Sequence, residues 1–252
     1  MTTTFALGSD ELEALEKTEI RDYFGGKRGG ICVEVGANEP TAHTSQSWHL
    51  ERDLDWQCVL VEPIPHLADQ ARDLRPNSKV CQVACTRADK VGELELFIPV
   101  VPNGEVLAHA SLQLNPDGFH YDNHTSIKVR AETLSKLLEE QGVDEIDLLS
   151  LDVEGAELEV LQGLDFTRWR PKLIVMEDKN VFLDKHLLIK RKGYVLARKL
   201  NGNNWYVPRG APRPSWALGE RIKLMYRMYV GIWPRKVRYA IRKRDWSPLK
   251  SI

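Results

Sequence analysis

The stretch SLDVEGAELEVL, Ser150 to Leu161, joins an apolar run to a helical pattern through an acidic turn. The residues before the turn are apolar enough for a buried strand, and apolar side chains return at helical spacing after Gly155. A buried strand followed directly by a helix is the repeating unit of a parallel sheet covered by helices. The stretch therefore predicts one such unit, with Asp152 and Glu154 at the end of its strand.

The same unit recurs along the chain, and several of its apolar runs are apolar on both faces, as in strands covered on both sides. The strand-like runs are 31–36, 58–63, 79–85, 94–100, 147–153, 172–178 and the less distinct 193–206. The helical segments are 66–75, 131–142 and 155–165, and an earlier helix begins at a Ser9 cap and stops at Gly25 and Gly26. We predict a doubly wound, mostly parallel α/β sheet with helices on both faces over residues 1–211.

The charge of the chain is divided unevenly along its length. From Pro212 onward eleven bases face two acids, whereas acids outnumber bases in the rest of the chain. Residues 212–252 are therefore predicted to form a basic, amphipathic C-terminal extension. Two interpretations of residues 218–252 stay open: packing on the acidic body or a subunit contact, and contact with an anionic membrane surface. Nucleic acid is disfavoured as a partner, because the body is acidic and carries no recognition motif.

Composition and targeting signals bound the compartment. The chain has 252 residues, 42% of them hydrophobic and 28% charged, which suits one large globular domain with an appendage. It has no run of eighteen apolar residues and no secretory signal at its start, and its four cysteines form no C-x-x-C pair. These features predict a cytoplasmic protein with free buried thiols, attached peripherally to the inner face of the membrane if the tail binds lipid.

Ligands of a doubly wound sheet bind beyond the carboxyl ends of its strands, and four of the predicted strand ends carry acids. Gly36 follows the first strand and permits positive φ or a close backbone approach. Glu62 ends the second strand, where an acid accepts hydrogen bonds from ribose hydroxyls. Together these two residues indicate an adenosine-bearing ligand. A G-x-G-x-x-G motif is missing from the first turn, which disfavours a dinucleotide and hence a nicotinamide-dependent oxidoreductase.

Five blocks in order resemble the FkbM family of S-adenosylmethionine-dependent methyltransferases. They are VEVGANEP, HTSQSWHLERDLDWQCVLVEPIP, VACTRADKVGELELF, LLSLDVEGAELEVLQGL and PKLIVME, which together span residues 31 to about 181. The resemblance implies a class I methyltransferase fold with S-adenosylmethionine lying over the first two strand ends. One departure stands out: many family members have a second glycine where this chain has Glu39-Pro40, which bears on the shape of the first loop.

The resemblance also implies which residues contact the cofactor. Glu34, Gly36 and Asn38 would meet its methionine and ribose side, and Glu62 the ribose hydroxyls. The turn at Val83 and Ala84 would meet the adenine edge, and Asp152 would project toward the methyl donor.

Methyl transfer to an alcohol requires that the acceptor oxygen lose its proton, which calls for a base or a metal ion. Asp152 and Glu154 are the predicted catalytic acids, and Asp152 with Glu177 and Asp178 forms a candidate Mg²⁺ site of hard oxygen ligands. Five histidines offer another base: His43, His49, His109, His120 and His124. His43 is preferred among them, because its loop should border the cofactor. The long polar segment 108–126 is expected to help form the acceptor pocket.

These expectations combine into an O-methyltransferase acting on a hydroxyl of a sugar or glycan, lipid-linked if the tail binds membrane. The acceptor class comes from the resemblance alone. The alternatives are methylation of a secondary-metabolite hydroxyl, and a binding module that keeps the adenosine pocket without turnover.

Overall fold

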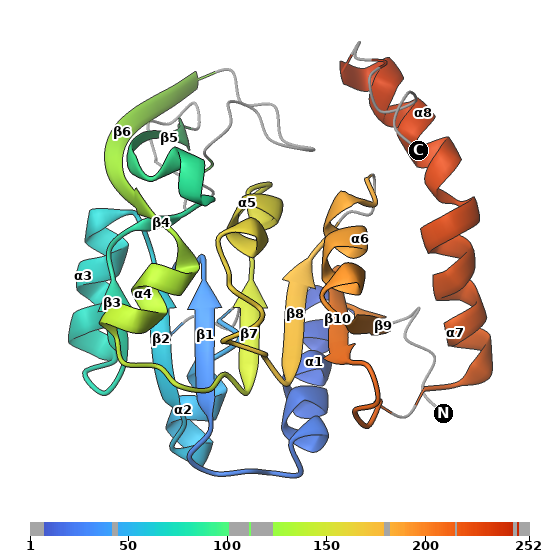
Figure 1. Ribbon diagram of the computed structural model, residues 1–252, viewed down its shortest axis with the longest axis horizontal. Helices are drawn as coiled ribbons and strands as arrows, with labels where there is room; N and C mark the ends of the chain where they lie inside the picture. The colour runs from blue at the N-terminus through green and yellow to red at the C-terminus, as the bar shows by residue number, and fades with distance from the viewer. Residues whose placement is uncertain are drawn as a thin grey trace.

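The computed structural model describes residues 8–41, 45–100, 111, 123–178, 182–214, 216–243 and 246. Its centre is a seven-stranded sheet with the order β3-β2-β1-β7-β8-β10-β9 (Figure 1). The strands are β1 (Ile31–Val35), β2 (Gln57–Val61), β3 (Lys79–Cys81), β7 (Leu148–Leu151), β8 (Leu173–Glu177), β9 (Tyr194–Leu200) and β10 (Asn203–Pro208). Strands β3, β2, β1, β7 and β8 pair in parallel, and β10 is antiparallel to both of its neighbours. The predicted doubly wound α/β architecture is confirmed.

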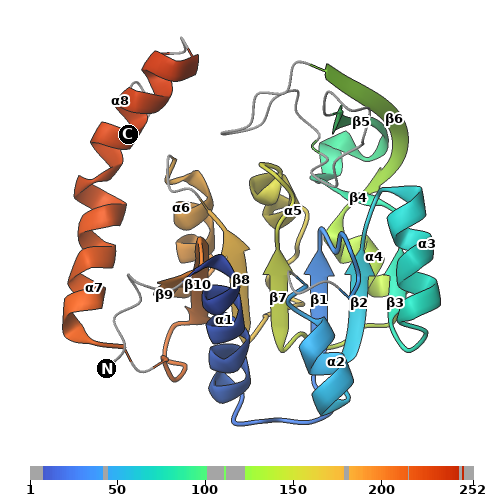
Figure 2. The same cartoon turned by 180° about the vertical axis from the view of Figure 1, so that it is seen from behind.

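Helices cover both faces of this sheet, as Figures 1 and 2 show from opposite sides. The covering helices are α1 (Ser9–Tyr23), α2 (Trp48–Leu54), α3 (Pro65–Leu74), α4 (Leu134–Glu140), α5 (Glu157–Gln162) and α6 (Asp184–Arg191). Apolar residues of α1, α2 and α3 share one core with Cys32, and those of α4, α5 and α6 share the other with Val33. Because successive strand residues point to opposite faces, a strand between two cores carries apolar residues on both faces.

A second, three-stranded sheet stands above the carboxyl end of the main one (Figure 1). It has the order β4-β6-β5, from β4 (Ala84–Cys85), β5 (Gly92–Val100) and β6 (Asn123–Glu132). The predicted single strand 79–85 is therefore wrong, because the chain turns at Val83 and divides it between the two sheets. Strand β6 was not predicted, and residues 131–132 complete it before Thr133 caps α4.

The less distinct segment 193–206 forms the β9–β10 hairpin. Its turn residues Asn201 and Gly202 have φ of 46° and 83°, the positive values that two-residue hairpin turns require. The hairpin inserts β10 between β8 and β9, which explains the antiparallel strand.

Helix α1 begins one residue earlier than its predicted cap implies. The N-cap is Gly8, whose N–H donates to Glu11 Oε2 at 2.9 Å, and Ser9 is already helical. The predicted stop is confirmed, since Gly25 and Gly26 follow the helix with φ of 60° and 68°.

The C-terminal segment is helical from α7 (Leu218–Met225) through a π-helical turn (Tyr226–Val230) to α8 (Ile232–Lys243). Pro234 does not interrupt it, because proline is tolerated in the first turn of a helix. Within the described part of the chain, every helix falls short of the length and hydropathy needed to cross a membrane.

Glu16 anchors α1 to the sheet and is fully buried. Its carboxylate accepts hydrogen bonds from Trp205 Nε1 at 2.8 Å, Asn203 Nδ2 at 2.7 Å and Gln46 Nε2 at 3.2 Å. Burial raises the pKa of Glu16 from 4.5 to about 7, although these three donors lower it. In this window of pH the folded protein holds a proton at Glu16 that the unfolded chain has released.

Glu16 should therefore make the protein less stable as the pH rises from about 4.5 to about 7. A pKa difference of this size corresponds to about 3 kcal/mol of unfolding free energy. Urea unfolding at about pH 5 and about pH 8 measures the change in unfolding free energy between the two conditions. In the variant Glu16→Gln most of this change should be lost. The exposed Asp22→Asn on the same helix is the control, and equal pH dependence in Glu16→Gln and wild type would contradict the assignment.

Candidate active site

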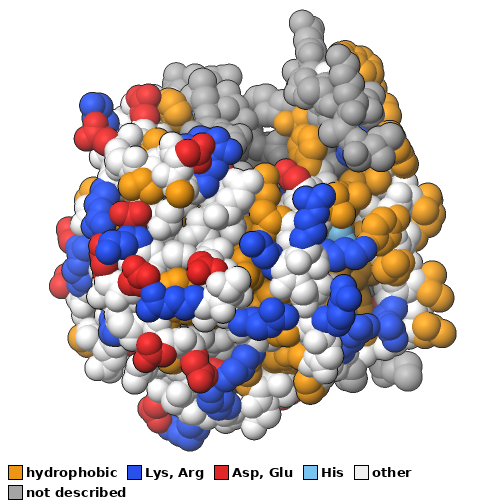
Figure 3. Space-filling model, viewed as in Figure 1, with side chains coloured by type: hydrophobic (Ala, Val, Ile, Leu, Met, Phe, Trp, Pro, Cys, Tyr) orange, Lys and Arg blue, Asp and Glu red, His pale blue; other side chains and the backbone are white. Residues whose placement is uncertain are grey.

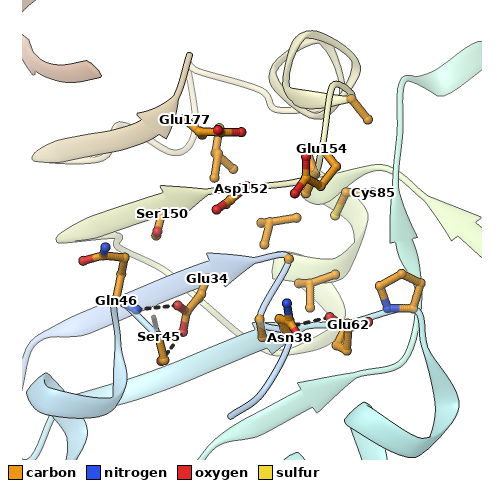
Figure 4. Close-up of a pocket in the computed structure, with 18 of the residues that line it drawn as sticks. Glu34, Asn38, Ser45, Gln46, Glu62, Cys85, Ser150, Asp152, Glu154 and Glu177 are labelled. Carbon is orange, nitrogen blue, oxygen red and sulfur yellow. Dashed lines mark hydrogen bonds between the residues drawn. The ribbon is translucent and has the colours of Figure 1, made fainter. Parts of the chain in front are cut away.

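A cavity of about 350 Å³ lies at the carboxyl edge of the main sheet (Figure 4). Its described lining comprises Glu13, Glu34, Val35, Gly36, Ala37, Asn38, Ser45, Gln46, Val61, Glu62, Pro63, Ile64, Val83, Ala84, Cys85, Leu96, Ser150, Leu151, Asp152, Val153, Glu154, Ala156, Glu177, Asn201 and Asn203. The ends of β1, β2, β7 and β8 meet there, as the rule for doubly wound sheets predicts. The cavity therefore gathers most of the residues that the sequence singled out.

Gly36 brings the ends of β1 and β7 into direct contact. Its φ is 84°, and a Cβ atom built on it would lie 1.8 Å from the carbonyl oxygen of Asp152. The backbone of Asp152 also donates to the carbonyl of Val35 at 3.1 Å. The close backbone approach that Gly36 permits is thus to Asp152 at the end of β7. This contact holds Asp152 beside the loop that follows β1.

Glu62 is buried at the end of β2 and organises the neighbouring turns. Its Oε2 accepts from the N–H of Asn38 at 2.8 Å, and its Oε1 accepts from the N–H of Ile64 at 2.9 Å. Burial raises the pKa of Glu62, while these two N–H donors lower it. Each carboxylate oxygen has capacity for one more donor. An acid in the cavity wall with this capacity fits the vicinal hydroxyls of a ribose.

Glu34 lines the same cavity, but its carboxylate is engaged by the protein. Ser45 Oγ donates to it at 3.1 Å, the N–H of Gln46 donates at 2.7 Å, and Ser47 Oγ donates as well. Arg75 lies 3.8 Å away. The side chain of Glu34 therefore holds the loop before α2. In this position the backbone next to Glu34, more than its carboxylate, is available to contact a cofactor.

Arg75 also secures the loop that departs from the family pattern. It is fully buried, pairs with Glu51 at 2.5 Å and donates to the carbonyl of Pro40 at 3.2 Å. Asn38, in the same loop, adopts φ of 48°. The Glu39-Pro40 sequence is therefore held by a buried arginine, and the loop remains part of the cavity wall through Asn38.

The predicted adenine edge lies at the junction of the two sheets. Val83 and Ala84 are both buried and line the cavity with Cys85 and Leu96. Apolar walls beside Glu62 suit a flat aromatic base joined to a ribose. Position alone supports this assignment, so the adenine contact remains a prediction.

Three carboxylates approach the other part of the cavity: Asp152, Glu154 and Glu177 (Figure 4). Glu154 has φ of 48°, a conformation that non-glycine residues adopt uncommonly and often at functional turns. Its carbonyl accepts from Ser111 Oγ at 2.9 Å, which ties the acidic turn to the segment beyond β5. This contact could not be predicted from the sequence, because Ser111 lies in a long polar stretch.

The three-carboxylate Mg²⁺ site predicted from the sequence is wrong. Asp178 is buried away from the cavity lining, 3.4 Å from Lys185 Nζ, and accepts from Asn204 Nδ2 at 3.0 Å. Glu177 and Asp178 are adjacent in the chain and leave the end of β8 in different directions. Across the described residues, no group of three or more His, Cys, Asp or Glu side chains is arranged to hold a metal ion.

Lys185 on α6 supports the acidic turn from behind. It also pairs with Glu157 at 3.1 Å, and Glu157 in turn accepts from the N–H of Gly155 at 2.9 Å. Although burial lowers it, the carboxylates of Glu157 and Asp178 raise the pKa of Lys185 above its usual value. Glu157 therefore has the structural role expected of an acid at a helix N-terminus.

The histidines fall into two groups. His43, the preferred base, lies outside the described residues, as do His109 and His120. His49 is buried, and its Nδ1 accepts from Arg21 Nε at 2.9 Å. Burial first, and then the charges of Arg21 and Lys17, lower the pKa of His49 to about 3. His49 and His124 are both absent from the described cavity lining, so neither is positioned as the base.

The sheet order with its one antiparallel strand is the class I methyltransferase topology that the resemblance implies, and the acid at the end of β2 lies beside an apolar wall, where the resemblance expects the cofactor. The sequence model of the protein family described as Methyltransferase FkbM domain matches residues 34–196. The chain belongs to this family, as the sequence resemblance predicted.

Individual relatives are more distant. Methyltransferase sdnD of Sordaria araneosa is 47% identical over 51 residues, which is 17% of this chain and 20% of that protein. The precorrin-6y C5,15-methyltransferase of Geobacter metallireducens has a TM-score of 0.40 and 10% identity, over 82% of this chain and 91% of that one. The TehB-like methyltransferase of Corynebacterium glutamicum has a TM-score of 0.38 and 14% identity, over 76% and 84%.

The contact between Gly36 and Asp152 predicts a specific cost for a methyl group. Gly36→Ala should lower the unfolding free energy by about 3 kcal/mol, because it adds a backbone clash to the strain of positive φ. It should also weaken S-adenosylhomocysteine binding at least tenfold in calorimetry. Gly142→Ala is the matched control: its φ is 60° and its Cβ would meet nothing within 4 Å. It should cost about 1 kcal/mol and leave binding intact; equal effects of the two variants would contradict the coupling.

Glu62 should contribute to affinity for the nucleoside. Glu62→Gln replaces one acceptor oxygen by a donor, so S-adenosylhomocysteine should bind about tenfold to a hundredfold more weakly. Glu132→Gln is the control, since Glu132 also accepts from a backbone N–H, that of Thr133 at 2.8 Å, but outside the cavity. If both variants bind S-adenosylhomocysteine like wild type, Glu62 does not contact the ligand.

Proposed function

We propose that the protein transfers the methyl group of S-adenosylmethionine to a hydroxyl oxygen of a sugar or glycan. The observation that carries the proposal is that Asp152 and Glu177, from adjacent strand ends, line the same cavity as Glu62 (Figure 4). Strands β7 and β8 are parallel neighbours, with Leu151 opposite Met176 in the ladder. A carboxylate pair thus lies next to the proposed cofactor site.

S-adenosylmethionine supplies a methyl group on a positively charged sulfur, so the donor is already activated. The remaining task is to remove the proton of the acceptor hydroxyl and to hold its oxygen in line. Asp152 takes the proton in this proposal, because Gly36 holds its backbone beside the first loop. Glu177 and the turn at Glu154 position the acceptor on the other side.

The walls around Glu177 suit an acceptor with several hydroxyl groups. Asn203 is paired with Glu177 in the sheet, and both line the cavity together with Asn201, Gln46 and Glu13. Amides both donate to and accept from hydroxyl groups, carboxylates accept from them, and together they hold a polyhydroxylated ligand in one orientation. An apolar acceptor would displace water from this polar wall without replacing the hydrogen bonds of that water, at a cost in affinity.

Asp152 should matter for turnover and much less for cofactor affinity. Asp152→Asn removes the base and should lower kcat at least a hundredfold. Its affinity for S-adenosylhomocysteine in calorimetry should change less than threefold. Asp69→Asn, an exposed acid on α3, is the control. A kcat within twofold of wild type would show that another group takes the proton.

The bond formed identifies the reaction. Transfer of a radiolabelled methyl group to a glycan fraction should give label that survives mild alkali, as an ether does. Release of the label as methanol would indicate a methyl ester instead. Label in small hydroxylated metabolites and none in glycans would favour the secondary-metabolite acceptor. Binding of S-adenosylhomocysteine without transfer to any acceptor fraction would favour a module that binds adenosine without turnover.

A further inference from the structure

The helix from α7 to α8 has two apolar faces, and the body covers one of them. Leu224, Met228, Ile232 and Ala240 are buried on the inner face. Beside them, Tyr229 Oη lies 3.0 Å from His186 Nε2 on α6. Ile222 and Met225 lie outside this inner face and are exposed. The helix is therefore held on the body without using its outer face.

The outer face is a continuous apolar stripe. Its members are Leu218, Ile222, Met225, Tyr226, Val230, Trp233, Val237 and Ile241, each between 39% and 69% exposed. Figure 3 shows hydrophobic side chains gathered along this edge, with Lys and Arg beside them. A stripe this long on a soluble surface marks an interaction site.

The π-helical turn keeps the outer stripe straight. Residues four apart drift by about 40° around an α-helix of 3.6 residues per turn. In the π-helical turn the N–H of Gly231 donates to the carbonyl of Tyr226 at 2.8 Å, five residues back. The wider turn offsets the drift, so Trp233 and Val237 continue the line of Leu218 and Ile222. Both faces of the helix depend on this turn.

Positive charge accompanies the stripe. Arg221, Arg227 and Arg238 are exposed on the same helix, and Glu220 is its one acid in the described residues from Leu218 to Lys243. Arg227 also lines a cavity of about 380 Å³ between α7 and β9, together with Arg198 and Lys199. We propose that the outer face of α7–α8 is a docking surface for an anionic lipid bilayer. Apolar side chains, interfacial Trp and Tyr, and flanking arginines are the combination that such a surface binds.

A second copy of the chain is the less suitable occupant. A symmetric dimer would place this face on itself and set the arginines of one copy against those of the other. An anionic headgroup layer neutralises the same charges. Helix α8 extends past the carboxyl edge of the sheet, on the side of β8, β9 and β10 (Figures 1 and 2). A bilayer on the outer face would therefore run along this side of the molecule and extend past the edge of the sheet that holds the cavity.

The test is sedimentation of the full chain with lipid vesicles. The protein should sediment with equal parts phosphatidylcholine and phosphatidylglycerol, at least tenfold more than with phosphatidylcholine alone, and added salt should reduce the difference. The triple variant Ile222→Ser, Trp233→Ser, Ile241→Ser should lose at least nine-tenths of this binding, as should Arg221→Gln, Arg227→Gln, Arg238→Gln. All six positions are exposed, so both variants should keep wild-type S-adenosylhomocysteine binding, which reports folding independently of the membrane.

The matched control is Leu74→Ser, Val91→Ser, which removes exposed apolar side chains elsewhere on the body and should bind vesicles like wild type. The proposal is overturned if wild type stays in the supernatant with anionic vesicles, or if the two tail variants sediment as well as the control. If wild type stays in the supernatant, light scattering then tests whether a second copy covers the outer face. Dimers of wild type that are lost in the variant Ile222→Ser, Trp233→Ser, Ile241→Ser would assign the outer face to a second copy.

Discussion

The backbone contact between Gly36 and Asp152 is the constraint on which the site depends. A glycine at positive φ lets the turn after β1 approach the end of β7 more closely than any side chain would permit. This contact sets the distance between the loop held by Glu62 and the acidic turn that carries Asp152. Both parts of the reaction therefore share one rigid frame, made of backbone from two parallel strands.

A second layer of buried charge supports that frame. Glu34, Glu51 and Arg75 lock the loop before α2, while Lys185 joins Glu157 to Asp178 behind the acidic turn. Each of these carboxylates meets a base or several N–H and O–H donors, which offsets the cost of burying it. The acids that look alike in the sequence thus divide into those that hold the site and those that face its cavity.

The sequence predicts the sheet and the edge that carries the site, because strands between two cores are apolar on both faces and their acidic ends stand out. It does not predict which acids face the cavity. Glu177 and Asp178 are adjacent and chemically alike, yet Lys185 pairs with Asp178 and Asn204 donates to Asp178, while Glu177 lines the cavity. Strand β6 escapes prediction because it is polar and lies in a separate sheet. The residues on the inner face of α7–α8 could not be predicted from a regular 3.6-residue period, because the π-helical turn shifts the helical phase.

In the proposed reaction, one cavity serves a nucleoside at the end of β2 and a reacting oxygen at the end of β7. A crystal structure with S-adenosylhomocysteine measures this most directly. We expect the ribose hydroxyls on the carboxylate of Glu62 and the thioether sulfur facing the side of the cavity lined by Asp152 and Glu177. A nucleoside bound away from Glu62, or a sulfur facing a surface that Asp152 does not share, would contradict it.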